Sequence, residues 1–160
     1  MSGLSYAAAR GGETPVTAFE SKLNGTLYGL MQWADWEQLQ HTLRSEVSTR
    51  WYVTAAGAES PDAPLTPDAL RQVVDAVAGL LKKDHLEDYL GIVYVDDVAD
   101  PTLIKIYDPN NLGSSCGSIG YKVQPGWVLS LDPPVRVTTP VPLPGNRQRW
   151  WASLRARLVG

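Results

Sequence analysis

The feature that most constrains the fold is a strongly amphipathic segment over residues 66–81. Thr66 is a residue type that caps helices, Pro67 suits the first helical position, and Asp68 complements the positive end of the helix dipole. Apolar side chains then recur at helical spacing on one face: Leu70, Val73, Val74, Val77 and Leu81. Because such a face must cover another apolar surface, the segment predicts a helix packed on a sheet.

The sheet itself is predicted from short segments rich in β-branched and aromatic residues. They cover residues 26–32, 51–54, 90–95, 103–107 and 127–131. The first of these segments could equally begin a helix. A second amphipathic helix is expected over residues 36–47, with Asp35 as its N-cap and Gln38 in the capping-box position. The order β-α-β-α-β-β-β predicts an α/β (α+β) sandwich of about five strands, with two main helices on the sheet and a short C-terminal helix.

Composition narrows the class of protein. The length of 160 residues fits one domain, expected over residues 19–132 behind a flexible N-terminal tail, residues 1–18. This tail lacks the apolar core of a secretory signal, and no segment approaches the roughly 18 apolar residues of a membrane span. The single cysteine excludes an internal disulfide and a multi-cysteine metal site, so we expect a cytoplasmic protein. A net charge of −3 gives no general attraction to nucleic acid, which is not an expected partner.

The C-terminal part of the chain differs from the rest. Residues 133–146 are predicted to form a proline-rich connector, and residues 147–160 an amphipathic Trp/Arg helix. Residues 136–160 hold five arginines and no acidic residue, and Arg with Trp is typical of interface hot spots. The candidate partner-binding residues are Arg147, Arg149, Trp150, Trp151, Leu154, Arg155 and Leu158. This helix can dock on its own domain, bind a partner or a second subunit, or lie on a membrane surface, although its small apolar face disfavours the membrane.

A long Gly/Ser loop over residues 108–126 holds the only cysteine, Cys116. Residues 113–117 match G-x-S-x-G, but no helical pattern follows the serine and both histidines precede it, which argues against a serine hydrolase. Glycine turns can stabilise a thiolate or bind an anion, so Cys116, with His85 as its base, is a candidate catalytic pair. The candidate ligand-binding residues of the loop are Asn110, Asn111, Gly113, Ser114, Ser115, Gly117, Ser118 and Lys122.

An acidic run extends from Asp84 to Asp108, with seven acidic residues and one lysine. Within it, His85 and Asp88 have the spacing i, i+3 and could share a divalent metal. The run lacks the calcium-loop signature, and such runs are usually solvated loop ends beside buried strands. We therefore expect no metal and no other cofactor, with His85 and Asp88 as the only metal candidates.

No complete catalytic constellation emerges from these patterns. The leading hypothesis is a non-enzymatic protein-binding or accessory factor that uses the C-terminal Trp/Arg segment and the 108–126 loop. Its partner would be another protein or a second copy of the chain. The alternative is a thiol-dependent enzyme, or a protein that binds a small anion or ligand, centred on Cys116.

Overall fold

The computed structural model describes residues 15–111, 125–137 and 143–159. These residues form one five-stranded sheet, four α-helices and a short 3-10 helix. The strands are β1 (Tyr28–Leu30), β2 (Tyr52–Ala55), β3 (Val93–Val95), β4 (Leu103–Ile106) and β5 (Trp127–Ser130). The helices are α2 (Ala18–Leu23), α3 (Trp33–Arg44), α4 (Pro67–Asp84), α5 (Gly145–Val159) and the 3-10 helix η1 (Pro109–Asn111).

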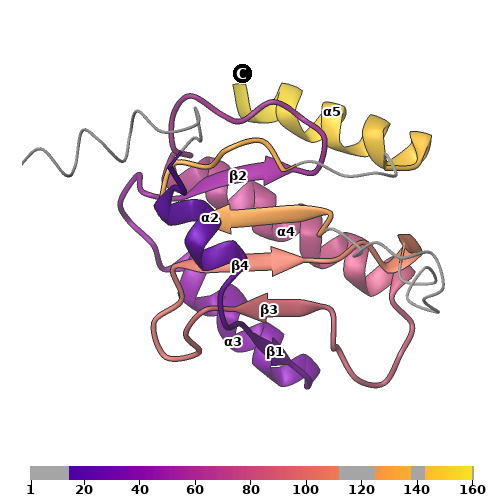
Figure 1. The fold of residues 1–160 in the computed structure, drawn as a ribbon. Helices are drawn as coiled ribbons and strands as arrows, with labels where there is room; N and C mark the ends of the chain where they lie inside the picture. The colour runs from indigo at the N-terminus through magenta and orange to yellow at the C-terminus, as the bar shows by residue number, and fades with distance from the viewer. Residues whose placement is uncertain (1–14, 112–124, 138–142, 160) are drawn as a thin grey trace, which may run out of the picture.

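The strand order in the sheet is β1-β3-β4-β5-β2, and every neighbouring pair is antiparallel. The predicted α+β class is confirmed, with the predicted succession of strands and main helices and a helix at the C-terminal end. The first two strands along the chain, β1 and β2, lie at opposite edges of the sheet (Figure 1). Helix α3 therefore belongs to the connection between the two edges.

The sheet has a large core on one face and a small core on the other. Helices α3, α4 and α5 contribute to the large core, into which Ile104 and Ile106 of β4 point. Helix α2 lies on the opposite face, where Phe19 packs with Leu103 and Val128 (Figure 1). Because side chains alternate along a strand, β4 and β5 supply both cores, which is why both strands are apolar at nearly every position.

Helix α2 begins at Ala18, inside the segment that the sequence predicts as a tail, residues 1–18; residues 1–14 lie outside the described part. A capping box starts this helix. The Thr17 hydroxyl accepts a hydrogen bond from the N–H of Glu20 at 3.1 Å, and the Glu20 carboxylate accepts one from the N–H of Thr17 at 3.1 Å. The spacing Thr-x-x-Glu was a readable signal for this start, but a helix of six residues is too short to show periodicity.

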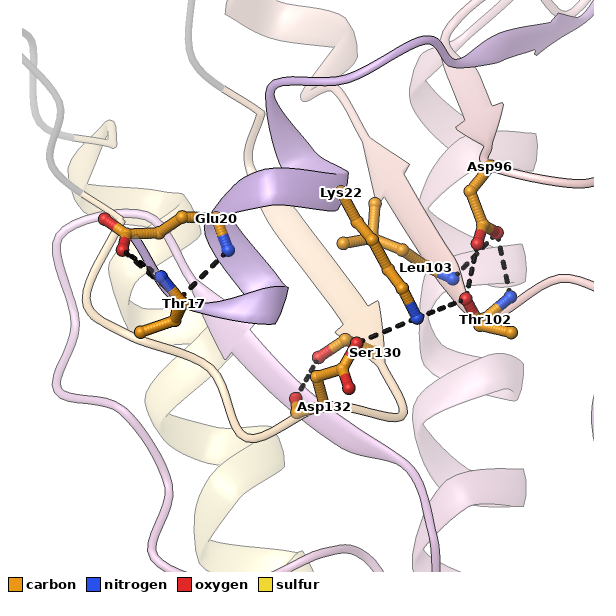
Figure 2. A network of polar contacts seen from close by, with 8 residues as sticks. All are labelled: Thr17, Glu20, Lys22, Asp96, Thr102, Leu103, Ser130 and Asp132. Atoms are coloured by element: carbon orange, nitrogen blue, oxygen red, sulfur yellow. Dashed lines mark hydrogen bonds and ion pairs between the residues drawn. The ribbon is translucent and has the colours of Figure 1, made fainter. Parts of the chain in front are cut away.

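Figure 2 shows how α2 is tied to the end of the sheet. The Lys22 ammonium donates a hydrogen bond to Thr102 Oγ1 at 2.9 Å and forms an ion pair with the Asp132 carboxylate at 2.9 Å. The Asp96 carboxylate accepts hydrogen bonds from the N–H groups of Thr102 and Leu103 at 2.8 and 3.0 Å, and from the Thr102 hydroxyl. Burial raises the pKa of Asp96, but these hydrogen bonds outweigh burial and leave the pKa below its usual value. Asp96 thus closes the turn between β3 and β4.

Helix α3 begins and ends at residues other than those expected. It starts at Trp33 with Gln32 as its N-cap, and the Asp35 carboxylate accepts a hydrogen bond from the N–H of Gln32 at 3.3 Å. The prediction of Asp35 as N-cap is therefore wrong, because this residue lies inside the first turn. The helix ends at Arg44 rather than at Val47, whose side chain is 86% exposed.

Glu46 explains why α3 stops before Val47. Its carboxylate accepts hydrogen bonds from Ser48 Oγ at 2.9 Å, Arg50 Nη2 at 3.0 Å and Trp51 Nε1 at 3.1 Å. Burial raises the pKa of Glu46, but these hydrogen bonds outweigh burial and lower the pKa to about 2. The ionised carboxylate thus holds the link between α3 and β2 in a folded turn.

We predict that Glu46→Gln destabilises the protein in a pH-dependent way. A carboxyl group with a lowered pKa in the folded state stabilises the fold above its unfolded pKa, near 4.5, and this contribution is lost as the pH falls toward about 2. The variant should therefore unfold at lower urea concentration than the wild type at neutral pH, and the two midpoints should converge in acid. A difference between the midpoints that does not change with pH would contradict the assignment.

Two glycines should respond oppositely to alanine. Gly79 lies in the interior of α4, and a Cβ built there meets nothing within 4 Å, so Gly79→Ala should raise the free energy of unfolding by about 0.5–1 kcal/mol. Gly91 has a φ of +71°, and a Cβ there would approach the Tyr89 ring at 3.2 Å. Gly91→Ala should therefore destabilise by at least about 1 kcal/mol. Urea unfolding of both variants checks these opposite signs.

Candidate functional site

Local hydrogen bonds shape the turn that leads into α5. The N–H groups of Arg147 and Gln148 both donate to the Pro144 carbonyl at 2.9 Å, and the Gln148 side chain donates to the Leu143 carbonyl at 2.7 Å. Leu143 is itself buried. The segment that leads into α5 is therefore held in place on both sides of Pro144.

Arg147 makes the most deeply buried charged contacts of the described residues. Its Nε lies 3.0 and 2.9 Å from the two carboxylate oxygens of Asp108, and its Nη2 lies 2.6 Å from Asp84 Oδ2. Only 5% of Arg147 and 2% of Asp108 are exposed. Asp84 is the last residue of α4 and Asp108 follows β4, so the three side chains join three distant segments. We call Arg147, Asp84 and Asp108 the Arg147 anchor.

The main effect of the Arg147 anchor is to fix the position of α5, and its net contribution to the free energy of unfolding is small. Moving charges out of water costs several kcal/mol, and their attraction roughly offsets this cost only when the geometry is good. Removing one partner leaves the other charge buried and unpaired, which is far more costly. Asp108 also accepts a hydrogen bond from the N–H of Asn110 at 2.9 Å, so the same carboxylate shapes the start of η1.

The apolar side of α5 packs on the core of its own domain. Leu154 is fully buried and Trp151 nearly so, while Trp150 and Leu158 are partly buried against the same core. The Trp150 ring meets the buried Trp127 ring edge to face, with centroids 5.2 Å apart. Of the three placements expected for the C-terminal helix, the structure describes docking on its own domain. Trp151, Leu154 and Arg147 are therefore covered while α5 is docked.

The outer side of α5 carries the candidates Arg149 and Arg155, together with Arg157, which the sequence did not single out. All three arginines are exposed, and none of them forms an ion pair with the described residues. We call these three residues the arginine face. Arg155 also lines a cavity of about 200 Å³ that lies against Trp151. The sequence predicted one binding helix, whereas the structure separates its residues into an inner packed side and an outer charged side.

Most candidates of the Gly/Ser loop lie outside the described residues. These are Gly113, Ser114, Ser115, Cys116, Gly117, Ser118 and Lys122. Asn110 is exposed on η1, and Asn111 ends this 3-10 helix. The thiol-enzyme alternative therefore stays a prediction, as does a contact between Cys116 and His85.

His85 has a structural position at the end of α4. Its Nε2 lies 2.7 Å from the Leu90 carbonyl oxygen and 3.1 Å from the Tyr89 carbonyl oxygen. Because carbonyl oxygens only accept hydrogen bonds, Nε2 carries the proton and is not free to bind a metal. Asp88 is exposed. Among the described residues, no group of three or more His, Cys, Asp or Glu side chains is arranged to hold a metal ion.

A second cavity of about 530 Å³ lies between α3 and α4. Its lining combines aromatic rings, three polar or charged side chains and two small residues: Trp33, Trp36, Glu37, Gln40, Ala78, Gly79, Lys82 and His85. The sequence patterns did not predict this cavity. One residue in the sequence points to it: Gly79 is a glycine in the interior of a helix, and no neighbouring atom of the described residues would prevent a larger side chain there.

Comparisons with models of known protein families, with curated proteins and with solved structures gave no match. Among the helices that the structure describes, none is long and apolar enough to cross a membrane. Any function assigned to the chain therefore rests on its own side chains.

We predict that Arg147→Met lowers the free energy of unfolding by about 3–5 kcal/mol, because it leaves the Asp108 carboxylate buried without a cation. Methionine keeps most of the apolar volume of the side chain. Arg149→Met is the matched control on the exposed side of the same helix and should change stability by less than about 0.5 kcal/mol. Urea unfolding measures both variants, and equal losses would contradict the proposed role of the anchor.

Proposed function

We propose that this chain is a non-enzymatic protein-binding or accessory factor, and that the arginine face of α5 binds an acidic segment of another protein. The observation that carries the proposal is the Arg147 anchor. It fixes α5 by one buried arginine and thereby turns Arg149, Arg155 and Arg157 to solvent. A fixed helix loses little conformational freedom when it binds, which favours affinity.

The charge of this surface supports an acidic partner. The chain as a whole has a net charge of −3, yet no acidic residue follows Asp132, so α5 and its connector are locally basic. Guanidinium groups bind carboxylates through two parallel hydrogen bonds, and arginine is enriched among the residues that dominate interface energies. Because residues two positions apart on a helix point to different sides, a matching partner would carry separate carboxylates for Arg155 and Arg157 rather than adjacent ones.

The cavity beside Trp151 supports a peptide-like ligand. Val53, Leu65 and Leu158 give it an apolar lining, and Arg155 lines it as well. An apolar side chain could enter this cavity while neighbouring carboxylates meet the arginines. Such a combination of a buried apolar anchor and peripheral charges is usual for protein interfaces.

The 108–126 loop is proposed as a second part of the surface. Its first residue, Asp108, belongs to the Arg147 anchor, so the described start of the loop is joined to the first turn of α5. We also propose a cytoplasmic location, which rests on the single cysteine of the sequence.

The test compares two charge reversals of equal size. Arg155→Glu with Arg157→Glu reverses the arginine face, and Lys82→Glu with Lys83→Glu reverses two exposed cations near the end of α4. Proteins captured by the tagged full chain from a lysate of its source are identified, purified and titrated against each form by calorimetry. We expect at least a tenfold loss of affinity for the first variant only, because rim charges act locally.

Binding to the wild type should also weaken as salt concentration rises, since exposed charges are screened. Equal affinities of the wild type and the Arg155, Arg157 variant would contradict the proposal.

A further inference from the structure

The cavity between α3 and α4 is bounded along the helices by two contacts. At one end the Trp33 and His85 rings meet, with centroids 5.8 Å apart. Beyond the other end, Arg44 Nη2 lies 2.7 Å from Asp75 Oδ1. Because the first residue of α3 meets the residue that follows α4, the two helices run antiparallel. The volume of about 530 Å³ lies within the range of roughly 300–1,000 Å³ that small-molecule sites occupy.

Hydrogen bonds hold the aromatic wall of this cavity in place. Trp33 Nε1 donates to the Glu87 carbonyl at 3.0 Å, and His85 Nε2 donates to the Leu90 carbonyl at 2.7 Å. Trp36 lines the cavity as well and is only 2% exposed. An aromatic ligand can pack against these rings, and side chains that are already fixed lose little conformational freedom when it binds.

Two opposite charges occupy matching positions on the two walls. Glu37 precedes Arg44 by seven residues in α3, which is about two helical turns. Lys82 follows Asp75 by seven residues in α4. In antiparallel helices Glu37 and Lys82 are therefore related as the bonded pair two turns away is. Both line the cavity, yet neither forms an ion pair with the described residues, so both charges are available to a ligand.

Gly79 keeps the α4 wall of the cavity open. A glycine inside a helix lowers the stability of that helix relative to alanine, and no described atom lies within 4 Å of a Cβ built there. Packing of the described residues therefore does not require this glycine. Stability that is given up at a position lining a cavity is characteristic of a functional site.

We infer that this cavity binds a small aromatic zwitterion, of the class of the aromatic amino acids. The ring of the ligand packs against Trp36 and the neighbouring rings, its carboxylate pairs with Lys82, and its ammonium pairs with Glu37. A ligand with a single charge would meet a like charge on one of the two walls, which favours the zwitterion. The inference goes beyond the proposed function, because the arginine face lies on α5, and either can fail without the other.

The test titrates the isotopically labelled full chain with phenylalanine and follows the amide chemical shifts. We expect saturable shifts in α3 and α4, with a dissociation constant on the order of 1 mM or below. Three analogues each lack one group: phenylpropanoate lacks the ammonium, phenethylammonium lacks the carboxylate, and free alanine lacks the ring. Each should bind at least tenfold more weakly than phenylalanine. Absence of saturable shifts up to about 20 mM phenylalanine, or equal affinities of phenylalanine and its analogues, would overturn the inference.

Gly79→Leu is the variant that separates binding from folding. It places a side chain in the cavity, and leucine favours a helix more than glycine does. It should abolish phenylalanine binding, while the free energy of unfolding measured in urea stays at or above that of the wild type. Gln72→Leu, at an exposed position of the same helix that does not line the cavity, is the matched control and should bind as the wild type does.

A second pair of variants tests the charge. Lys82→Met should weaken phenylalanine binding at least tenfold, because the ligand carboxylate loses its cation. Lys83→Met removes the neighbouring exposed cation, which does not line the cavity, and should leave binding unchanged. Unchanged binding by Gly79→Leu, or equal effects of the two lysine variants, would contradict the inference.

Discussion

The arrangement of this molecule depends on one buried arginine. Arg147 reaches the Asp108 carboxylate after β4 and the Asp84 carboxylate at the end of α4, and it thereby joins the last helix to the sheet and to the longest helix. Non-directional apolar contacts would allow α5 several positions on the core. A guanidinium group that is paired through two of its nitrogens allows α5 only one position, because its hydrogen bonds have fixed directions.

Because of this constraint, the Trp/Arg segment has a structural role that its composition alone does not indicate. The composition of α5 is that of a binding helix, yet its tryptophans and Leu154 are used mainly for packing within the chain. The arginines that stay exposed lie on the outer side of the helix.

The sequence predicted local structure well and long-range pairing poorly. The helix after Thr66 and the five strands have periodicities that are independent of the rest of the chain, and the structure confirms them. The two partners of Arg147 lie 39 and 63 positions away in the sequence. The strand order likewise depends on pairing between distant segments, which the local periodicity of a sequence does not encode. Helix α3 ended early because Glu46 gathers three side-chain donors, a competition with helix formation that apolar spacing does not reveal.

Helix α5 packs as an integral part of the domain and is held there by the Arg147 anchor. Native-state hydrogen exchange of backbone amides tests it most directly, because it measures the free energy of opening for each element separately. We expect amides in the middle of α5 and in β4 to exchange only through global unfolding, with equal opening free energies. Amides of α5 that exchange through a local opening several kcal/mol less costly than that of β4 would contradict it.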